Sequence, residues 1–168
     1  HVPQPESAIY YPASGILGEL GYMSIGIGYT LPFQLFAAPW IDAEKLAATL
    51  NGRGIEGVRF RPLYIQPFYS AHAGENLGGV QMYVTDFNKA ELTAIQFQVL
   101  EAIAELYPEK KVFDNANEGR YRMFDQVCGT NYIRETFARN NKYSDIREYW
   151  NKDVAAFKEL SAKYYLYR

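Results

Sequence analysis

Glu19, Glu75 and Asp86 are the candidate carboxylates for acid–base chemistry outside the evident helix surfaces. Most glycoside hydrolases place two carboxylates across the bond that they cleave, one as an acid and one as a base or nucleophile. Carboxylates are mostly exposed in folded proteins, so a surface or capping role is the ordinary expectation for each of the three. The spacing leaves open whether any two of them meet.

Other reactive groups are few. A single cysteine, Cys128, excludes an internal disulfide and a cysteine-based metal site, and we expect it to be a buried thiol. Two histidines, His1 and His72, cannot form a multi-histidine centre, and no Gly-x-Ser-x-Gly motif accompanies His72. We therefore expect no metal site and no catalytic triad.

The segment Gly26-Ile27-Gly28 is a Gly-x-Gly motif. A dinucleotide fingerprint needs a third glycine at position 31 and a helix beginning there, but Leu31 stands at that position and Pro32 follows. We expect no organic cofactor. The glycines predict a tight backbone path, either against packed neighbours or against a ligand.

The composition narrows the class of ligand. The net charge is −2 and the basic residues are dispersed, which argues against a nucleic-acid partner. No apolar run is long enough to span a membrane. The 15 Tyr, 10 Phe and 2 Trp residues suit a surface that stacks on sugars, although tyrosine also fills half-buried positions. Trp40 is a sugar platform or, slightly favoured, a core anchor.

The elements that must position these residues predict one α+β domain over residues 1–168. We expect a mixed, mostly antiparallel sheet in the N-terminal half, packed with helices from the C-terminal half. Residues 1–18 are predicted to be an extended lead-in. After them, an apolar–polar alternation predicts strands over residues 22–28, 57–67 and 78–86.

Helices are predicted by capping residues and apolar spacing. Asp42 caps a helix that Asn51-Gly52 ends, and residues 92–106 form a second helix. Residues 109–121 read as a loop, and Asp125 as a structural hydrogen-bonding residue at a helical corner. Ser144 caps one long final helix whose apolar face is Ile146, Trp150, Phe157, Leu160 and Tyr164.

In order and spacing, these segments resemble the NamZ-type exo-β-N-acetylmuramidases, long catalogued as a domain of unknown function. That family carries a Glu, then Ser-Val-Gly-Arg-Gly-Thr, Pro-Phe-(Gln/Glu) and Gly-Ala-Pro-Trp. The corresponding segments of this chain are Glu19, Met23–Gly28, Pro32–Gln34 and Ala37–Trp40. Further matches follow at Gly57–Pro62, Ile65–Pro67, Gly79–Asp86, Leu106–Pro108, Phe124-Asp125, Gly129-Thr130, Trp150, Phe157 and Tyr165–Tyr167.

The resemblance implies a longer, two-domain protein that removes terminal β-N-acetylmuramic acid from peptidoglycan fragments without a cofactor. Its N-terminal domain is expected to be Rossmann-like and to carry the catalytic glutamate. This chain, which begins without Met and shows no signal peptide, is then the cleft-forming C-terminal domain, not competent alone. Its partners would be peptidoglycan-derived sugars and the missing N-terminal domain, in the periplasm or outside the cell. The alternative is a non-catalytic carbohydrate-binding or scaffold module.

The expected substrate-binding residues are Glu19, Ser24, Gly26, Gly28, Gln34, Trp40 and Tyr69, with Glu19 also a candidate for catalysis. Two positions depart from the family pattern. The Arg between the glycines is Ile27 here, and the Thr after them is Tyr29. An arginine could fork onto the lactyl carboxylate of muramic acid, whereas isoleucine cannot, so we expect a shift in how the substrate is recognised.

Overall fold

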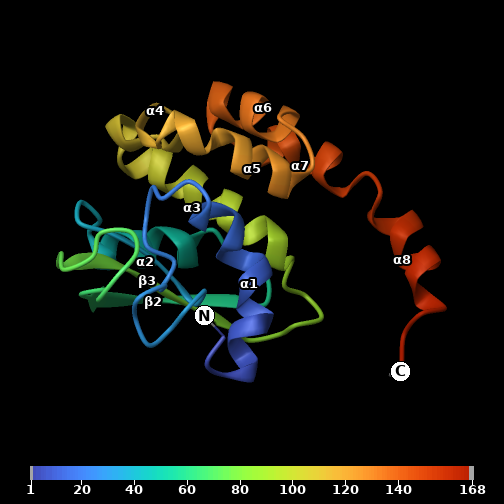
Figure 1. Ribbon diagram of the computed structural model, residues 1–168, viewed down its shortest axis with the longest axis horizontal. Coiled ribbons are helices and arrows are strands. Elements are labelled where there is room, and N and C mark those ends of the chain that lie inside the picture. Colours follow the sequence, from blue (N-terminus) through green and yellow to red (C-terminus); the bar gives the residue numbers. More distant parts are fainter. Residues whose placement is uncertain (1, 167–168) are drawn as a thin grey trace.

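The computed structural model describes residues 2–166 and has an α+β fold, as predicted (Figure 1). The strands are β1 (Leu35–Ala38), β2 (Val58–Ile65) and β3 (Leu77–Val84), in the order β1-β3-β2. Both pairings are antiparallel, so among the described residues the sheet is antiparallel throughout and not mixed. Tyr167, the last residue of the family resemblance, lies outside the described range.

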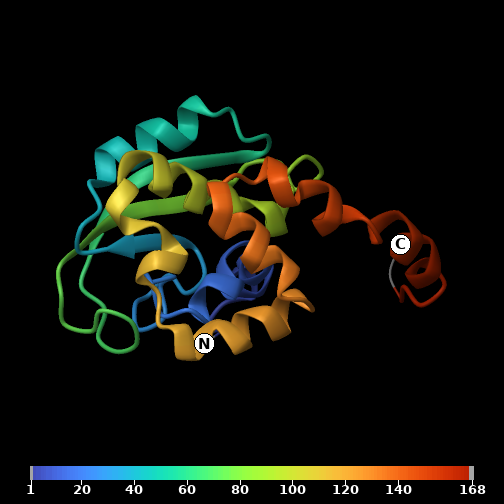
Figure 2. The same ribbon diagram turned by 90° about the horizontal axis from the view of Figure 1, so that it is seen from above.

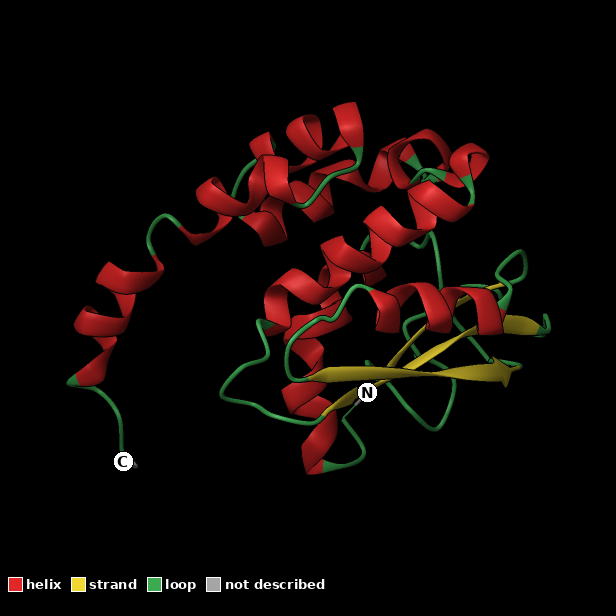
Figure 3. Cartoon of the chain, turned by 180° about the vertical axis from the view of Figure 1, so that it is seen from behind, coloured by secondary structure: helices red, strands yellow, loops and turns green. Residues whose placement is uncertain are grey.

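The helices lie mainly on one side of this sheet. They are α1 (Pro5–Gly18), α2 (Ala43–Gly52), α3 (Leu92–Leu106), α4 (Val112–Asn115), α5 (Tyr121–Cys128), α6 (Tyr132–Asn140), α7 (Ser144–Asn151) and α8 (Val154–Ala162), with 3-10 turns η1 (Pro108–Lys110) and η2 (Glu118–Arg120). Figure 3 shows most of the helices stacked on one side of the sheet, with α1 running past the sheet and α8 standing apart. Helices from both halves of the chain therefore cover the sheet, because α1 and α2 join those of the C-terminal half.

The two faces of the sheet belong to different apolar clusters. Phe36, Phe60 and Met82 point into the main core with the helices, where Met82 pairs with Phe60 across β2 and β3. Leu35 and Leu77 lie in a smaller cluster on the other face, which Tyr29 and Leu31 cover. The alternation of a strand thus places the segment before β1 on the back of the sheet.

Helix α2 begins and ends as the sequence predicts. The Asp42 side chain accepts a hydrogen bond from the Lys45 amide at 3.0 Å. At the other end, the Asn51 side chain donates to the Phe60 carbonyl at 2.7 Å and accepts from the Phe60 amide at 3.0 Å. These two bonds join α2 to the edge strand β2.

The prediction of an extended lead-in at residues 1–18 is wrong, because Pro5–Gly18 form α1. A proline in the first turn is tolerated, since its missing amide has no partner there. Pro12 inside the helix removes one helical hydrogen bond. The helix forms because Ala13 and Leu17 are fully buried in the core and because Gln96 donates to the Pro12 carbonyl at 3.2 Å.

The predicted strand at residues 22–28 is also wrong. Only Ser24 forms a bridge, to Ala37 of β1. Gly26 and Gly28 have φ values of +90° and +86°, which turn the chain away from an extended path. The segment therefore leaves the sheet after Ser24 and loops over its back.

Two further predictions in the C-terminal half need correction. Residues 109–121 contain the short turns of η1, α4 and η2, which Val112 ties to the core. The long final helix is two helices, α7 and α8, and Ser144 begins α7 without a side-chain cap. Ile146 is buried, whereas Phe157, Leu160 and Tyr164 of the predicted apolar face are exposed.

Candidate functional site

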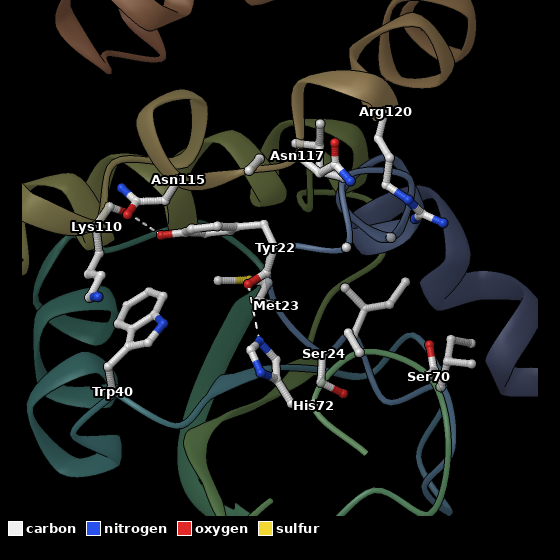
Figure 4. Close-up of a pocket in the computed structure, with 17 residues that line it drawn as sticks. Tyr22, Met23, Ser24, Trp40, Ser70, His72, Lys110, Asn115, Asn117 and Arg120 are labelled. Carbon is white, nitrogen blue, oxygen red and sulfur yellow. Dashed lines mark hydrogen bonds between the residues drawn. The ribbon is translucent and has the colours of Figure 1, made fainter.

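A cavity of about 640 Å³ opens where three segments far apart in the sequence meet (Figure 4). The first is the turn between α1 and β1, which contributes Tyr22 to Ile25 and Ile27. The second is the loop of Ser70 to His72 between β2 and β3, and the third runs from Lys110 to Arg120. Such a concave site with a few polar groups is the usual form of a small-molecule site.

One wall of the cavity is aromatic. The Trp40 ring packs between Tyr22 and Tyr107, with ring centroids 5.6 and 5.4 Å apart. The Tyr22 hydroxyl donates a hydrogen bond to the Lys110 carbonyl, which fixes this ring against the third segment. Burial, and then the charge of Glu109, raise the pKa of Tyr22, so its hydroxyl stays a hydrogen-bond donor. Trp40 is half-buried and belongs to both the edge of the core and the cavity.

His72 forms part of the floor of the cavity. Its Nδ1 lies 3.2 Å from Glu75 Oε1, and its Nε2 lies 3.3 Å from the Tyr22 carbonyl oxygen. Both partners are acceptors, so the ring makes both hydrogen bonds only when each nitrogen carries a proton. The loop holds this ring with Ser70 and His72 in the left-handed region, at φ values of +77° and +61°. His72 is therefore held in place between a carboxylate and a backbone carbonyl at the floor of the cavity.

The side chains of Lys and Arg that line the cavity give it charge of one sign, positive. Lys110 and Arg120 line it, and none of its lining residues, all within the described range, is Asp or Glu. Arg120 Nη1 donates to the Glu19 carbonyl at 3.1 Å, which leaves the other donors of the guanidinium for a ligand. Asn115 and Asn117, from the same segment of the chain, add amide groups to the lining (Figure 4). The arrangement suits a ligand with a carboxylate and several hydroxyl or amide groups.

The structure brings some of the predicted site residues to this cavity. Ser24 and Trp40 line it, and Glu19 lies between the lining residues Gly18 and Leu20. The Ser24 side chain is buried and accepts from the Gly26 amide at 3.3 Å. Gln34 is also buried, beside β1, and is not among the lining residues, so Glu19 and Gln34 do not converge in the cavity.

The two glycines pack against backbone. A Cβ on Gly26 would lie 2.1 Å from the Leu31 carbonyl oxygen, and one on Gly28 would lie 2.0 Å from the Tyr69 carbonyl oxygen. Where a Cβ would stand, both glycines therefore face packed backbone, which is one of the two alternatives that the sequence left open. Gly28 and Tyr69 also line an adjoining cavity of about 600 Å³, and Ile27 lines both cavities.

The sequence did not point to His72, Arg120 or the asparagines as residues of this site. In the sequence, His72 stands without the partners of a triad or a metal centre, and residues 109–121 read as a polar loop. Their one signal is composition, because Asn115, Asn117 and Arg120 are polar groups close together in a segment without helical periodicity.

Within residues 2–166, no group of three or more His, Cys, Asp or Glu side chains is placed to hold a metal ion. Over the same residues, no helix has the length and apolar character needed to cross a bilayer.

Comparisons with known proteins agree with the family resemblance. The family model described as "Exo-beta-N-acetylmuramidase NamZ, C-terminal" matches residues 9–167. The chain is 35% identical over 167 residues to the peptidoglycan beta-N-acetylmuramidase NamZ of Bacillus subtilis. This match covers 99% of the chain but only 39% of the Bacillus subtilis protein. It superposes with a TM-score of 0.96 and 56% identity on a crystal structure of a DUF1343 family protein from Bacteroides fragilis, covering 100% of this chain and 44% of that one. The chain belongs to the family of C-terminal domains of the exo-β-N-acetylmuramidase NamZ.

Proposed function

We propose that this chain is the cleft-forming part of a longer enzyme that removes terminal β-N-acetylmuramic acid from peptidoglycan fragments, and that the cavity at Trp40 holds part of the sugar. The observation that carries the proposal is the cavity lining, which combines the cations Lys110 and Arg120 with the aromatic rings of Tyr22 and Trp40 and has no carboxylate. The family membership and the name of the Bacillus subtilis relative support it.

The chemistry of N-acetylmuramic acid fits these groups. The sugar carries a carboxylate on its lactyl ether, an acetamide and free hydroxyls. A guanidinium binds a carboxylate through parallel hydrogen bonds, so Arg120 would take the lactyl group. In this assignment, Arg120 takes the role of the family arginine that Ile27 replaces, because Ile27 and Arg120 line the same cavity. Asn117 would hydrogen-bond the acetamide or a hydroxyl, and Trp40 would stack on a sugar face.

The two carboxylates of glycoside hydrolysis are not assembled in this cavity. We therefore place the general acid and its partner in the N-terminal part of the longer protein, with Glu19 as the one candidate that this chain could add at the rim. In this proposal, residues 2–166 bind and orient the sugar, and the other part supplies the reacting groups. The reaction belongs where peptidoglycan is exposed, in the periplasm or outside the cell.

A second candidate function is a scaffold or sugar-binding module without a share in catalysis. The exposed apolar side chains of α8 favour it, because a large exposed apolar surface marks an interaction site. The two functions differ in one respect: a pure scaffold would not bind sugar in the cavity.

A titration distinguishes them. Isotopically labelled protein is titrated with N-acetylmuramic acid, with N-acetylglucosamine and with the disaccharide of the two, while amide shifts are recorded. We expect saturable shifts at Tyr22, Ser24, His72 and Asn117, at lower concentrations with muramic acid than with glucosamine. Equal affinity for the two sugars would contradict the role of Arg120. No shifts with millimolar sugar, in the full-length protein as well, would contradict the sugar site.

A further inference from the structure

Helix α8 stands apart from the rest of the protein. Figures 1 and 2 show it projecting beyond α7, clear of the body in both views. Every described residue from Asn151 onward is exposed except Ser161, which is half-buried. Val154 to Ala162 belong to neither apolar cluster of the domain.

A helix of this length needs a partner. Isolated helices shorter than about 12 to 15 residues are marginal in water, and most helical stability comes from packing of an apolar face. α8 has nine residues, and Asp153 before it provides no side-chain cap. The body of the domain does not supply the packing, so another surface must.

The helix has an apolar face to offer. Val154, Phe157 and Leu160 recur at helical spacing, and Tyr164 and Tyr165 extend the row past the end of α8. Phe157, Leu160 and Tyr164 are 65%, 57% and 71% exposed. A groove of about 510 Å³ beside this face runs from Trp150 to Tyr165. The charged residues Lys158, Glu159 and Lys163 alternate with this row.

The projection of α8 is shared with a protein that has more chain. The Bacteroides fragilis crystal structure matches 100% of this chain with a TM-score of 0.96, so the match includes α8. More than half of that protein's chain lies outside the match, since this chain covers 44% of it. The helix thus projects in the same way where a further part of the protein is present to receive it.

We propose that the apolar face of α8 docks on the N-terminal part of the longer protein and clamps the two parts together. The partner of the helix is the large segment outside this chain, which makes up more than half of the Bacteroides fragilis chain. It must offer an apolar strip to Phe157 and Leu160 with room for aromatic rings. The inference rests on the proposed function only in that both assign an N-terminal part to the protein.

The test uses the full-length protein and hydrogen exchange at the amides of residues 154–162. The double variant Phe157→Ser, Leu160→Ser is compared with Phe68→Ser, which removes a phenylalanine that is 91% exposed in a loop. In the unsubstituted protein and in Phe68→Ser, we expect these amides to be protected. The double variant should exchange at least about tenfold faster there, while the amides of α3 stay protected. The single variant Phe157→Leu, which keeps an apolar side chain at this position, should retain most of the protection.

Three results would overturn the inference. One is exchange at the unprotected rate in the unsubstituted full-length protein. Another is equal protection in the double variant. The third is protection that falls on dilution together with a dimer-to-monomer change in light scattering, which would name a second copy as the partner. Turnover of a muramic acid substrate is measured in parallel. Protected α8 amides in a protein without turnover would contradict the proposed function and leave the docking of α8 supported.

Discussion

Arg134 forks onto Asp125, with Nε 2.9 Å from Oδ1 and Nη2 2.8 Å from Oδ2. The pair joins α6 to α5 at a corner where Gly129 adopts the left-handed conformation. Both side chains are about one-fifth exposed, so water screens the pair only partly. The hydrogen bond to Asp125 raises the pKa of Arg134, which keeps the guanidinium charged. The sequence-based expectation that Asp125 has a structural role is confirmed.

Loss of this pair should destabilise the fold. We expect Arg134→Ala to lower the free energy of unfolding by about 2 kcal/mol, since hydrogen bonds between charged groups contribute about that much. The control is Arg147→Ala, whose partner Glu91 is 3.5 Å away with both side chains more than half exposed. That change should cost less than about 1 kcal/mol. Urea unfolding measures both, and equal losses would contradict the prediction.

Glu101 should make stability depend on pH. Burial alone would raise the pKa of its carboxyl, but hydrogen bonds from the Tyr143 amide, Lys142 and Arg53 outweigh burial and lower the pKa below its usual 4.5. A carboxyl with a lowered pKa stabilises the folded state above the unfolded-state pKa, and this contribution is lost as the pH falls through the folded-state pKa. The unfolding free energies of the protein and of Glu101→Gln should therefore differ most at pH 7 and converge below pH 4.5.

Glu148→Gln, on the exposed side of α7, serves as the control for this experiment. Its difference from the unsubstituted protein should stay small at every pH. A constant difference for Glu101→Gln between pH 7 and pH 3 would show that its hydrogen bonds do not depend on its charge.

Gly28 should not tolerate a side chain. Gly28→Ala combines a positive φ of +86° with a Cβ 2.0 Å from the Tyr69 carbonyl oxygen. Gly54→Ala has a positive φ of +66° but no atom within 4 Å, so it isolates the conformational part. We expect Gly54→Ala to cost about 1 kcal/mol and Gly28→Ala about 3 kcal/mol or more, because backbone must move. Equal costs in thermal unfolding would mean that the loop at Tyr69 yields freely.

Arg120 should control affinity for the acidic sugar. In the full-length enzyme, we expect Arg120→Gln to raise KM for a muramic acid substrate about 10- to 100-fold, the loss of one charged hydrogen-bonding contact. Arg120→Lys should lie between, since a lysine keeps the charge without the fork. Arg122→Gln, two residues away and outside the cavity lining, is the matched control. An unchanged KM in Arg120→Gln with an unchanged melting temperature would remove Arg120 from the sugar site.

Cys128 should be unreactive in the folded protein. Burial, and then the charge of Asp125, raise the pKa of this thiol to about 12. The thiolate is the nucleophile, so alkylation by iodoacetamide at pH 8 should be at least about tenfold slower than for free cysteine. Mass spectrometry follows the modification, and denaturant should restore the full rate. Fast labelling without denaturant would contradict the predicted protection of this thiol.

The sequence predicted the elements whose signals are local. The Asp42 cap defines α2, and the apolar spacing of residues 92–106 defines α3 with the bounds that the structure has. It failed where tertiary contacts outweigh propensity. Pro12 and Gly15 argue against a helix, yet the burial of Leu17 against the core holds α1 together. The site could not be assembled from sequence, because Trp40, His72 and Arg120 meet only through the fold.

The two tryptophans of the chain each lie at one of the proposed contact surfaces. Trp40 lines the sugar cavity, and Trp150 lines the groove beside α8, where its Nε1 donates to the Thr93 hydroxyl at 3.0 Å. Residues 1–168 contain 2 Trp, so Trp40→Phe and Trp150→Phe each remove the tryptophan of one surface and keep that of the other. The difference in tryptophan fluorescence between the unsubstituted protein and each variant can therefore follow sugar entry and interdomain docking separately, without an added label.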